Sequence, residues 1–265
     1  MCAQLNEGCA PWEALLSFSS TMKRLDQELV ERGLCDSREK AKRAIMAGQV
    51  RINQQTARKP SDSVSADDEL SLDAPEKYAS RGGHKLEHAL MQFRVDVAGK
   101  VAIDLGASTG GFTDCLLQHG AKKVYAVDVG TGQLAWNLRK DSRVVVMEKT
   151  NARDLRPDHF PAPADIITAD CSFISLQKIL PAAVALLQPS GKIVALIKPQ
   201  FEAGKAEADK GAGVITDPAV HERVLRELQA FAETTLPLRW ACVTESPLLG
   251  PAGNKEFLVL LETIG

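Results

Sequence analysis

Four charged residues stand at the ends of expected strands and helices: Lys85, Asp170, Lys198 and Glu256. Lys85 lies in RGGHKL, Asp170 closes IITAD, Lys198 closes IVALIK, and Glu256 opens KEFLVLL. Side chains that follow parallel strands meet at the edge of the sheet where ligands bind. Two lysines and two carboxylates at that edge could remove the proton of a weakly acidic hydroxyl group, since an amine within hydrogen-bond reach can act as its base.

The segments that would position these residues alternate between strand and helix from Lys100 onward. Apolar runs such as VAIDLG, ADIITAD and KIVALIK read as buried strands, and GGFTDCLLQHG and AVHERVLRELQAFAETT read as helices. This alternation predicts an α/β fold, in which a Rossmann-like and mostly parallel sheet is covered by helices on both faces.

The first strand–turn–helix segment, IDLGASTGGFTD, predicts a cofactor site. Gly106, Gly110 and Gly111 allow the backbone to approach a ligand, and a helix is expected to start at the glycine pair. The G-x-x-x-G-G spacing differs from the dinucleotide pattern. Asp104 at the strand end would repel a pyrophosphate but suits the cationic amino-acid end of S-adenosylmethionine. Asp128, 24 residues after Asp104, could accept both ribose hydroxyls.

These features predict an S-adenosylmethionine site, and the acids at two strand ends disfavour the alternative of a simple tight turn. Asn151 and Ala152, after the third strand, are expected near the adenine. The predicted cofactor-binding residues are Asp104, Gly106, Ser108, Gly110, Gly111, Phe112, Asp128, Asn151 and Ala152.

The turn after the fourth strand discriminates among methyl acceptors. Amino-group methyltransferases usually carry Asp/Asn-Pro-Pro-aromatic there, whereas this chain has Asp170-Cys171-Ser172-Phe173. Methylation of a pyrimidine carbon needs a cysteine nucleophile and usually a second cysteine after the fifth strand. Cys171 could serve, but the fifth strand ends in Lys198-Pro199-Gln200. A buried structural thiol is the expected role of Cys171.

Lys198 is the residue that best fits a base. A ribose 2′-hydroxyl is a very weak acid, so its methylation gains from a base at the moment of transfer. Lys85 could supply a neighbouring positive charge, while Asp170 and Glu256 could hold the ammonium groups. The alternative is a set of unrelated surface ion pairs. For Phe173, Phe201 and Phe257, which flank the tetrad in sequence, core packing is expected, with stacking on a flipped-out base as the alternative.

Residues 22–72 predict a small α+β domain that binds RNA. KRLDQELVERG and SREKAKRAIMAG have helical spacing, with Ser37 as an N-cap, and QVRIN and DDELSLD read as strands. Ten Lys and Arg against five Asp and Glu between Lys23 and Lys59 favour phosphate contacts over simple solvated helix faces. The predicted RNA-binding residues are Arg24, Arg38, Lys42, Arg43 and Arg51.

The sequence also predicts where the parts of the chain begin and end. We expect a poorly ordered leader over 1–21, a linker over 73–84 and the methyltransferase domain over 85–265. The segment 202–216 could form a loop over the acceptor through Lys205 and Lys210, or an ordinary solvated connection. Six scattered cysteines without a C-x-x-C pair predict no metal site. A poor signal peptide and no long apolar run predict a cytoplasmic protein without a membrane span.

Two segments resemble known families. RLDQELVERGLCDSREKAKRAIMAGQVRIN resembles the αL-type RNA-binding motif of ribosomal small-subunit protein four. The combination of ASRGGHKLEHAL, DLGASTGGFTD, ADCSFISL, IKPQFE and GNKEFL is similar to the TlyA (hemolysin A) group of FtsJ-like RNA 2′-O-methyltransferases. This resemblance spans about Met22 to Glu262, and only the joint EKYA departs from the basic-x-Trp-Val segment of some relatives.

The resemblance implies that Lys85, Asp170, Lys198 and Glu256 form a Lys-Asp-Lys-Glu tetrad with Lys198 as the base. It also implies that the substrate is cytidine ribose of ribosomal RNA. We further expect that the enzyme acts on assembled ribosomal subunits and that it is a monomer. Two other functions remain as alternatives: a membrane-active cytolysin, for which we find no amphipathic or spanning segment, and an RNA-binding assembly factor without catalysis, which the complete tetrad disfavours.

Overall fold

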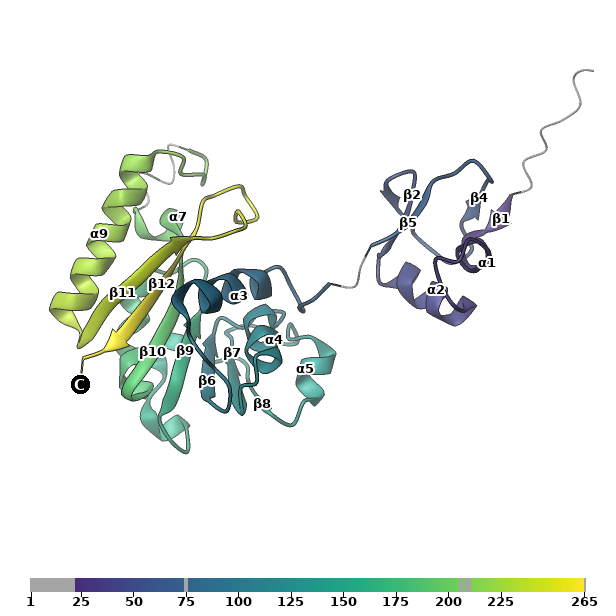
Figure 1. Ribbon diagram of the computed structural model, residues 1–265. Coiled ribbons are helices and arrows are strands. Elements are labelled where there is room, and N and C mark those ends of the chain that lie inside the picture. Colours follow the sequence, from purple (N-terminus) through teal and green to yellow (C-terminus); the bar gives the residue numbers. More distant parts are fainter. Residues whose placement is uncertain (1–21, 74–75, 205–206, 208–210, 265) are drawn as a thin grey trace, which may run out of the picture. The chain divides into compact units, whose positions relative to one another are not determined.

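The computed structural model describes residues 22–73, 76–204, 207 and 211–264 (Figure 1). The chain divides into two compact units, Met1–Pro75 and Glu76–Gly265. The expected leader over 1–21, and Lys205 and Lys210 of the expected acceptor loop, lie outside the described residues.

The smaller unit is a small α+β domain. Its two helices pack on each other over the core side chains Leu25, Leu29, Ala41 and Ile45. Ser37 caps the second helix by accepting a hydrogen bond from the backbone N–H of Lys40, as predicted. The elements are β1 (Lys23–Arg24), α1 (Leu25–Glu31), α2 (Arg38–Met46), β2 (Val50–Ile52), β3 (Gln55–Thr56), β4 (Ser63–Val64) and β5 (Leu70–Leu72).

The larger unit begins with a helix and continues as alternating strands and helices. Its elements are α3 (Gly82–Phe93), β6 (Val101–Leu105), α4 (Gly111–Gln118), β7 (Lys123–Val127), α5 (Trp136–Lys140), β8 (Val144–Met147), the 3₁₀ helices η2 (Ala152–Asp154), η3 (Pro157–His159) and η4 (Leu176–Lys178), β9 (Ala164–Ala169), α6 (Leu180–Leu186), β10 (Leu187–Ile197), α7 (Pro199–Glu202), α9 (Pro218–Thr235), β11 (Leu238–Glu245) and β12 (Phe257–Thr263).

The strands of this unit form one sheet in the order β11-β12-β10-β9-β6-β7-β8. The pairs among β6, β7, β8, β9 and β10 are parallel, while β12 is antiparallel to both β10 and β11. The mostly parallel α/β fold is therefore confirmed. The chain starts at β6 in the middle, runs out to β8 and then crosses back to β9, so the strand order switches between β6 and β9. Ligands of such sheets bind at this switch point.

Alternate side chains of the strands feed two apolar layers. Ile103 and Leu105 face the layer that contains α6 and α9, whereas Ala102 faces the layer that contains α3 and α4. Figure 1 shows α9 and α3 on different sides of the strands. Burial on both faces explains why the strands read as continuous apolar runs in the sequence.

Residues 76–81 precede α3 within the larger unit and pack against its helices. The backbone N–H of Ala79 donates to Asp114 Oδ2 at 2.8 Å, and Tyr78 is 2% exposed within the apolar layer of α3 and α4. A Cβ added to Gly83 would lie 2.2 Å from Tyr78 Cγ, so the glycine makes room for the ring.

In the part of the chain that the structure describes, no helix is long and apolar enough to cross a membrane, and no cluster of His, Cys, Asp and Glu side chains could hold a metal ion.

Candidate active site

Two neighbouring cavities open at the carboxyl ends of β6 and β9, where the strand order switches. The larger cavity has a volume of about 600 Å³ and the smaller one about 250 Å³. Gly106, Ser108, Asp170 and Ser172 line both. Ligands in the two cavities would therefore lie next to each other along this shared wall. Group transfer between two molecules needs such proximity.

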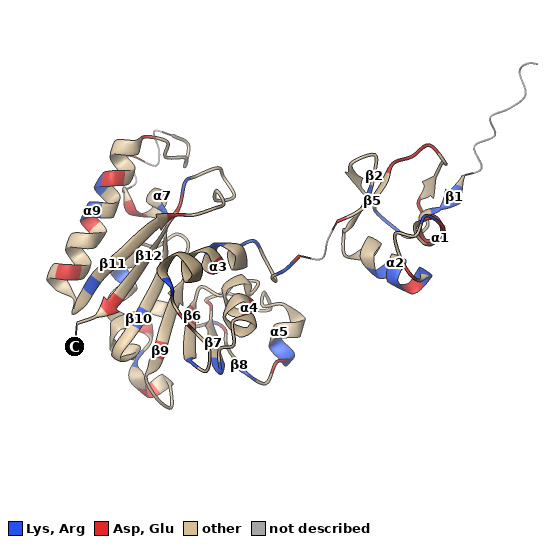
Figure 2. Ribbon diagram, in the orientation of Figure 1, with Lys and Arg blue, Asp and Glu red and all other residues tan. Residues whose placement is uncertain are grey.

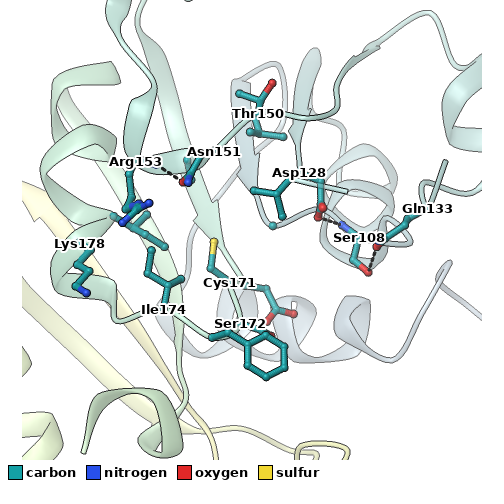
Figure 3. A pocket seen from close by; sticks show the side chains of 17 residues that line it. Ser108, Asp128, Gln133, Thr150, Asn151, Arg153, Cys171, Ser172, Ile174 and Lys178 are labelled. Atoms are coloured by element: carbon teal, nitrogen blue, oxygen red, sulfur yellow. Dashed lines mark hydrogen bonds between the residues drawn. The ribbon is translucent and has the colours of Figure 1, made fainter. Parts of the chain in front are cut away.

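A carboxylate at the end of β7 is fixed in the wall of the larger cavity. Asp128 Oδ2 accepts a hydrogen bond from the backbone N–H of Ser108 at 2.8 Å (Figure 3), and Oδ1 accepts one from Gly130 at 2.7 Å. These bonds orient the carboxylate, and each oxygen keeps lone pairs for a ligand. An acid held in this way fits the two hydroxyls of a cofactor ribose.

The loop after β8 supplies the next part of the larger cavity. Asn151 and Ala152 line it, and the side-chain oxygen of Asn151 accepts from the backbone N–H of Arg153 at 3.1 Å (Figure 3). Thr150 and Arg153 also line this cavity. Their place in the loop just after β8 was the feature of the sequence that could have identified them. Lining residues that sequence reasoning missed are Val127, Val129, Gln133, Thr150, Arg153, Ile174, Lys178 and Ile179.

Three of the four residues predicted as catalytic line the smaller cavity. Lys85 comes from α3, Asp170 follows β9, and Lys198 follows β10. Glu256, which precedes β12, is 1% exposed and pairs with Lys85, although the two lie 171 positions apart in the chain. The fold thus brings all four residues to one place.

Lys85 and Glu256 form a buried ion pair. Lys85 is 7% exposed, and its Nζ donates a hydrogen bond to Glu256 Oε2. Gly250 passes close over the carboxylate, where an added Cβ would lie 2.6 Å from Glu256 Oε1. Loss of either partner would leave the other charge buried and unpaired, so this pair holds its geometry firmly.

Lys198 makes two polar contacts with the loop after β9. Its Nζ lies 2.6 Å from Asp170 Oδ1 and donates a hydrogen bond to Ser172 Oγ at 2.7 Å. Sequence reasoning did not single out Ser172, whose only signal was its place two residues after Asp170. Each lysine therefore has its own carboxylate, which balances the charge around the smaller cavity.

Asp104 lies elsewhere than the sequence indicated. It lines neither cavity, is 0% exposed, and accepts hydrogen bonds from the hydroxyls of Thr113 at 2.7 Å and Thr168 at 2.9 Å. Burial raises the pKa of its carboxyl to about 6, against the effect of the two hydroxyls. Asp104 is the next-to-last residue of β6, and its side chain ties β6 to α4 and β9 instead of lining a cavity.

The glycine turn divides between the two cavities. Gly111 and Phe112, predicted for the cofactor, line the smaller cavity. Gly110 lines neither and is the N-cap of α4 with φ +97°, where an added Cβ would lie 2.3 Å from Leu138 Cδ1. The helix therefore starts at the glycine pair as predicted, and Gly110 serves close packing.

Cys171 is a partly buried thiol that lines the larger cavity and makes a structural contact. Its Sγ donates to the carbonyl oxygen of Leu105 at 3.4 Å, and burial raises the pKa of the thiol to about 12. The nucleophilic form of cysteine is the thiolate, so these surroundings disfavour nucleophilic attack by Cys171.

Phe173 differs from the core packing that the sequence led us to expect. Its side chain is 91% exposed, its φ is +62°, and its ring centroid lies 5.0 Å from that of Phe201. Phe173 also lines the larger cavity. A wholly exposed aromatic ring beside the shared wall offers a flat surface to a second ligand.

The residues predicted to bind RNA lie on one compact unit, and most carry carboxylate partners. Figure 2 shows Lys and Arg along α2. Arg24 and Arg38 both pair with Asp26, Lys42 pairs with Glu39, and Arg51 pairs with Asp73. Arg43 is exposed and makes no ion pair with any residue that the structure describes.

The two units match two known families. The chain matches the FtsJ-like methyltransferase family over residues 78–263 and the S4 domain over residues 23–70. It belongs to the FtsJ-like methyltransferase family. This confirms the resemblance that the sequence motifs indicate, and S-adenosylmethionine is the methyl donor. The fixed carboxylate of Asp128 in the larger cavity fits that cofactor.

Relatives match along most of the chain. It is 49% identical to YqxC of Bacillus subtilis over 252 residues, which cover 94% of this chain and 88% of that protein. It is 48% identical to TlyA of Mycobacterium tuberculosis, a 16S/23S rRNA (cytidine-2′-O)-methyltransferase, over 91% of this chain and 90% of that protein. A solved structure from Streptococcus thermophilus, of a protein that carries the name hemolysin, is 44% identical, with a TM-score of 0.70 over 92% of this chain and 90% of its own.

Proposed function

We propose that this enzyme transfers a methyl group from S-adenosylmethionine to the 2′-hydroxyl of cytidine ribose in ribosomal RNA. The observation that carries the proposal is the pair of lysine–carboxylate contacts, Lys85–Glu256 and Lys198–Asp170, beside a cavity that adjoins the cofactor cavity. The name of the tuberculosis relative supports ribosomal cytidine as the acceptor.

Lys198 takes the role of base. A hydroxyl in the smaller cavity would meet its Nζ, which Asp170 and Ser172 already hold in place through short contacts. Once Lys198 had given up its own proton, its neutral amine would take the 2′-hydroxyl proton as the 2′-oxygen bonded to the methyl carbon and the bond from that carbon to sulfur broke. When bound, the cofactor supplies a methyl group on a positively charged sulfur and leaves as S-adenosylhomocysteine.

The other tetrad members position the acceptor. Lys85 lines the smaller cavity and forms an ion pair with Glu256. Its ammonium group can also donate hydrogen bonds to the ribose or to its phosphate. Phe173 is free to stack on the base of a nucleotide that leaves its helix to enter the site.

The smaller unit would hold the RNA. Its S4 domain and local excess of Lys and Arg support contacts with phosphates. We propose that the substrate is an assembled ribosomal subunit, that the enzyme acts as a monomer, and that it works in the cytoplasm, where such subunits are found.

Substitution of the base tests the proposal. Lys198→Ala should lower the rate of ribose methylation by roughly a hundred-fold or more, since general-base catalysis is worth about 10²–10⁴-fold. Mass spectrometry of cytidines from both ribosomal subunits and from naked ribosomal RNA would measure the product. Binding of S-adenosylhomocysteine, followed by calorimetry, should be unchanged.

Lys192→Ala is the matched control, because Lys192 lies on β10, the strand that Lys198 follows, outside both cavities, and pairs with Glu262 at the surface. If Lys198→Ala methylated ribose as fast as this control, Lys198 would not be the base. If the wild-type enzyme produced no 2′-O-methylcytidine on any of the substrates, the proposed reaction itself would fail.

A further inference from the structure

A carboxylate stands four residues after the proposed base Lys198, at the end of a short helix. Glu202 is the last residue of α7, the short helix that begins directly after Lys198. Its Oε2 accepts a hydrogen bond from Ser175 Oγ at 2.6 Å, and its Oε1 accepts one from the backbone N–H of Leu176 at 2.8 Å. Both donors lie where the loop after β9 leads into η4: Ser175 is the N-cap of η4 and Leu176 is its first residue.

This loop forms the shared wall of the two cavities. Asp170 and Ser172 line both, and Phe173 lines the larger one. Phe173 has a φ of +62°, a conformation that is unfavourable for a bulky residue and persists only where surrounding contacts impose it. The loop is therefore a strained segment that needs an anchor.

Glu202 has the features of that anchor. It is partly buried, and burial raises the pKa of its carboxyl, yet no Lys or Arg that the structure describes pairs with it. A buried carboxylate without a cation is costly, and its two hydrogen bonds offset that cost only while the loop stays in this conformation. Glu202 lines neither cavity, so it has no contact with a ligand there.

Three contacts join the loop to the segment after β10. Lys198 reaches Asp170 and Ser172, the Phe201 ring packs on Phe173, and Glu202 binds the far end of the loop. Only the first includes a catalytic group. The residues of the third contact, Ser175, Leu176 and Glu202, line neither cavity.

We propose that Glu202 is a positioning residue, which clamps the loop 170–176 to α7 and so places Asp170, Ser172 and Phe173 relative to Lys198. The proposal rests on the proposed function, because its effect is measured on methyl transfer. The role needs an acceptor for the Leu176 N–H and a hydrogen-bond partner for Ser175 Oγ, and it needs no negative charge. Gln in place of Glu could keep it, with the amide oxygen on Leu176 and the amide nitrogen donating to Ser175 Oγ.

The test compares Glu202→Ala, Glu202→Gln and Ser175→Ala in the full-length enzyme. At saturating S-adenosylmethionine, Glu202→Ala should lower kcat by about ten-fold or more, because a displacement of about 1 Å in a reacting group can cost up to 10²-fold. Ser175→Ala removes one of the two bonds and should lower kcat by about three-fold, while Glu202→Gln should stay within about three-fold of wild type. Glu227→Ala, which removes a surface partner of Arg223 on α9, is the control and should match wild type.

A second measurement does not depend on catalysis. Amide hydrogen exchange over residues 171–176 should be faster in Glu202→Ala and near wild type in Glu202→Gln, with the thermal midpoint of each variant well above the assay temperature. Unchanged kcat in Glu202→Ala would overturn the proposal, as would equal losses in the Ala and Gln variants. If the wild-type enzyme methylated no ribose, the proposed function would fail while the exchange data still tested the clamp.

Discussion

At the scale of single residues, Asp104 shows how burial sets the chemistry of one group beneath the site. Its carboxyl is completely buried with two threonine hydroxyls as donors, and burial raises its pKa to about 6. The hydroxyls of Thr113 and Thr168 can donate to a carboxylate or accept from a carboxylic acid. This hydrogen-bonded group, which joins β6 to α4 and β9, therefore titrates closer to neutral pH than an ordinary aspartate does.

This shift predicts a dependence of stability on pH. Because the folded pKa of about 6 lies above the ordinary value of 3.8, the folded protein holds the Asp104 proton more tightly than the unfolded chain does. Its contribution is fully present below about pH 4 and is lost as the pH rises through 6. Relative to wild type, Asp104→Asn should thus gain roughly 2–3 kcal/mol of unfolding free energy between pH 4 and pH 7, since one pKa unit corresponds to about 1.4 kcal/mol.

Urea unfolding of both proteins at several pH values would measure this difference. Acids whose pKa is lowered by ion pairs, such as Asp141 beside Arg143, give the opposite slope in both proteins and cancel in the comparison. A difference between wild type and Asp104→Asn that did not vary with pH would contradict the assignment.

Lys85, Asp170, Lys198 and Glu256 could be singled out as candidates from the sequence because their motifs are specific and each stands next to an apolar run. Their pairing could not, since nothing in the sequence says that Lys85 meets Glu256 while Lys198 meets Asp170. The cofactor contact expected of Asp104 differs from the structure for a related reason. A strand-end position fixes the edge of the sheet but not the direction of the side chain.

At the scale of elements, the site depends on how closely the turn after β6 approaches the loop after β9. Gly106 has a φ of +82°, and an added Cβ would lie 2.7 Å from the carbonyl oxygen of Asp170. The two strands are neighbours at the switch point, so this contact sets the width of the shared wall between the cavities. The alternation of apolar and helical runs predicted the strands, whereas their order, and hence this contact, follows from packing that the sequence pattern does not encode.

Gly106→Ala should therefore disturb both stability and cofactor binding. The strained φ costs about 1 kcal/mol for a residue with a Cβ, and displacement of the Asp170 backbone should add at least about as much again. Gly99→Ala is the matched control, because Gly99 has a φ of +70° but nothing within 4 Å of an added Cβ.

Thermal unfolding and calorimetric titration with S-adenosylhomocysteine would separate the two effects. Gly99→Ala should lose only the strain energy and bind the cofactor product as wild type does. Equal losses of stability in the two variants, with unchanged cofactor affinity in Gly106→Ala, would show that the turn tolerates a wider shared wall.

At the scale of the whole molecule, the chain divides its work between two units with separate apolar cores. The larger unit contains both cavities and all four tetrad residues, while the smaller unit carries the S4 domain and a local excess of positive charge in a chain with a net charge of −2. The sequence predicted the S4-like pattern and its basic residues. It could not tell which of them are neutralised, because the partner carboxylates Asp26 and Asp73 lie up to 22 positions away in the chain.

Arg43 and Arg38 on α2 should therefore act differently when each is changed to Ala. Arg43 is exposed without an ion pair among the described residues, so its loss should reduce the salt dependence of RNA binding by about one counterion and leave unfolding within about 0.5 kcal/mol of wild type. Arg38 donates to the fully buried Asp26 at 2.9 Å, so its loss leaves that carboxylate with Arg24 alone and should destabilise the smaller unit by roughly 1–2 kcal/mol.

Filter binding to ribosomal subunits at several salt concentrations, together with urea unfolding, would measure the effects of both substitutions. Because the cofactor lies in the other unit, neither variant should change the affinity for S-adenosylhomocysteine, and an Arg43→Ala enzyme with the wild-type salt dependence would rule out a phosphate contact at that position.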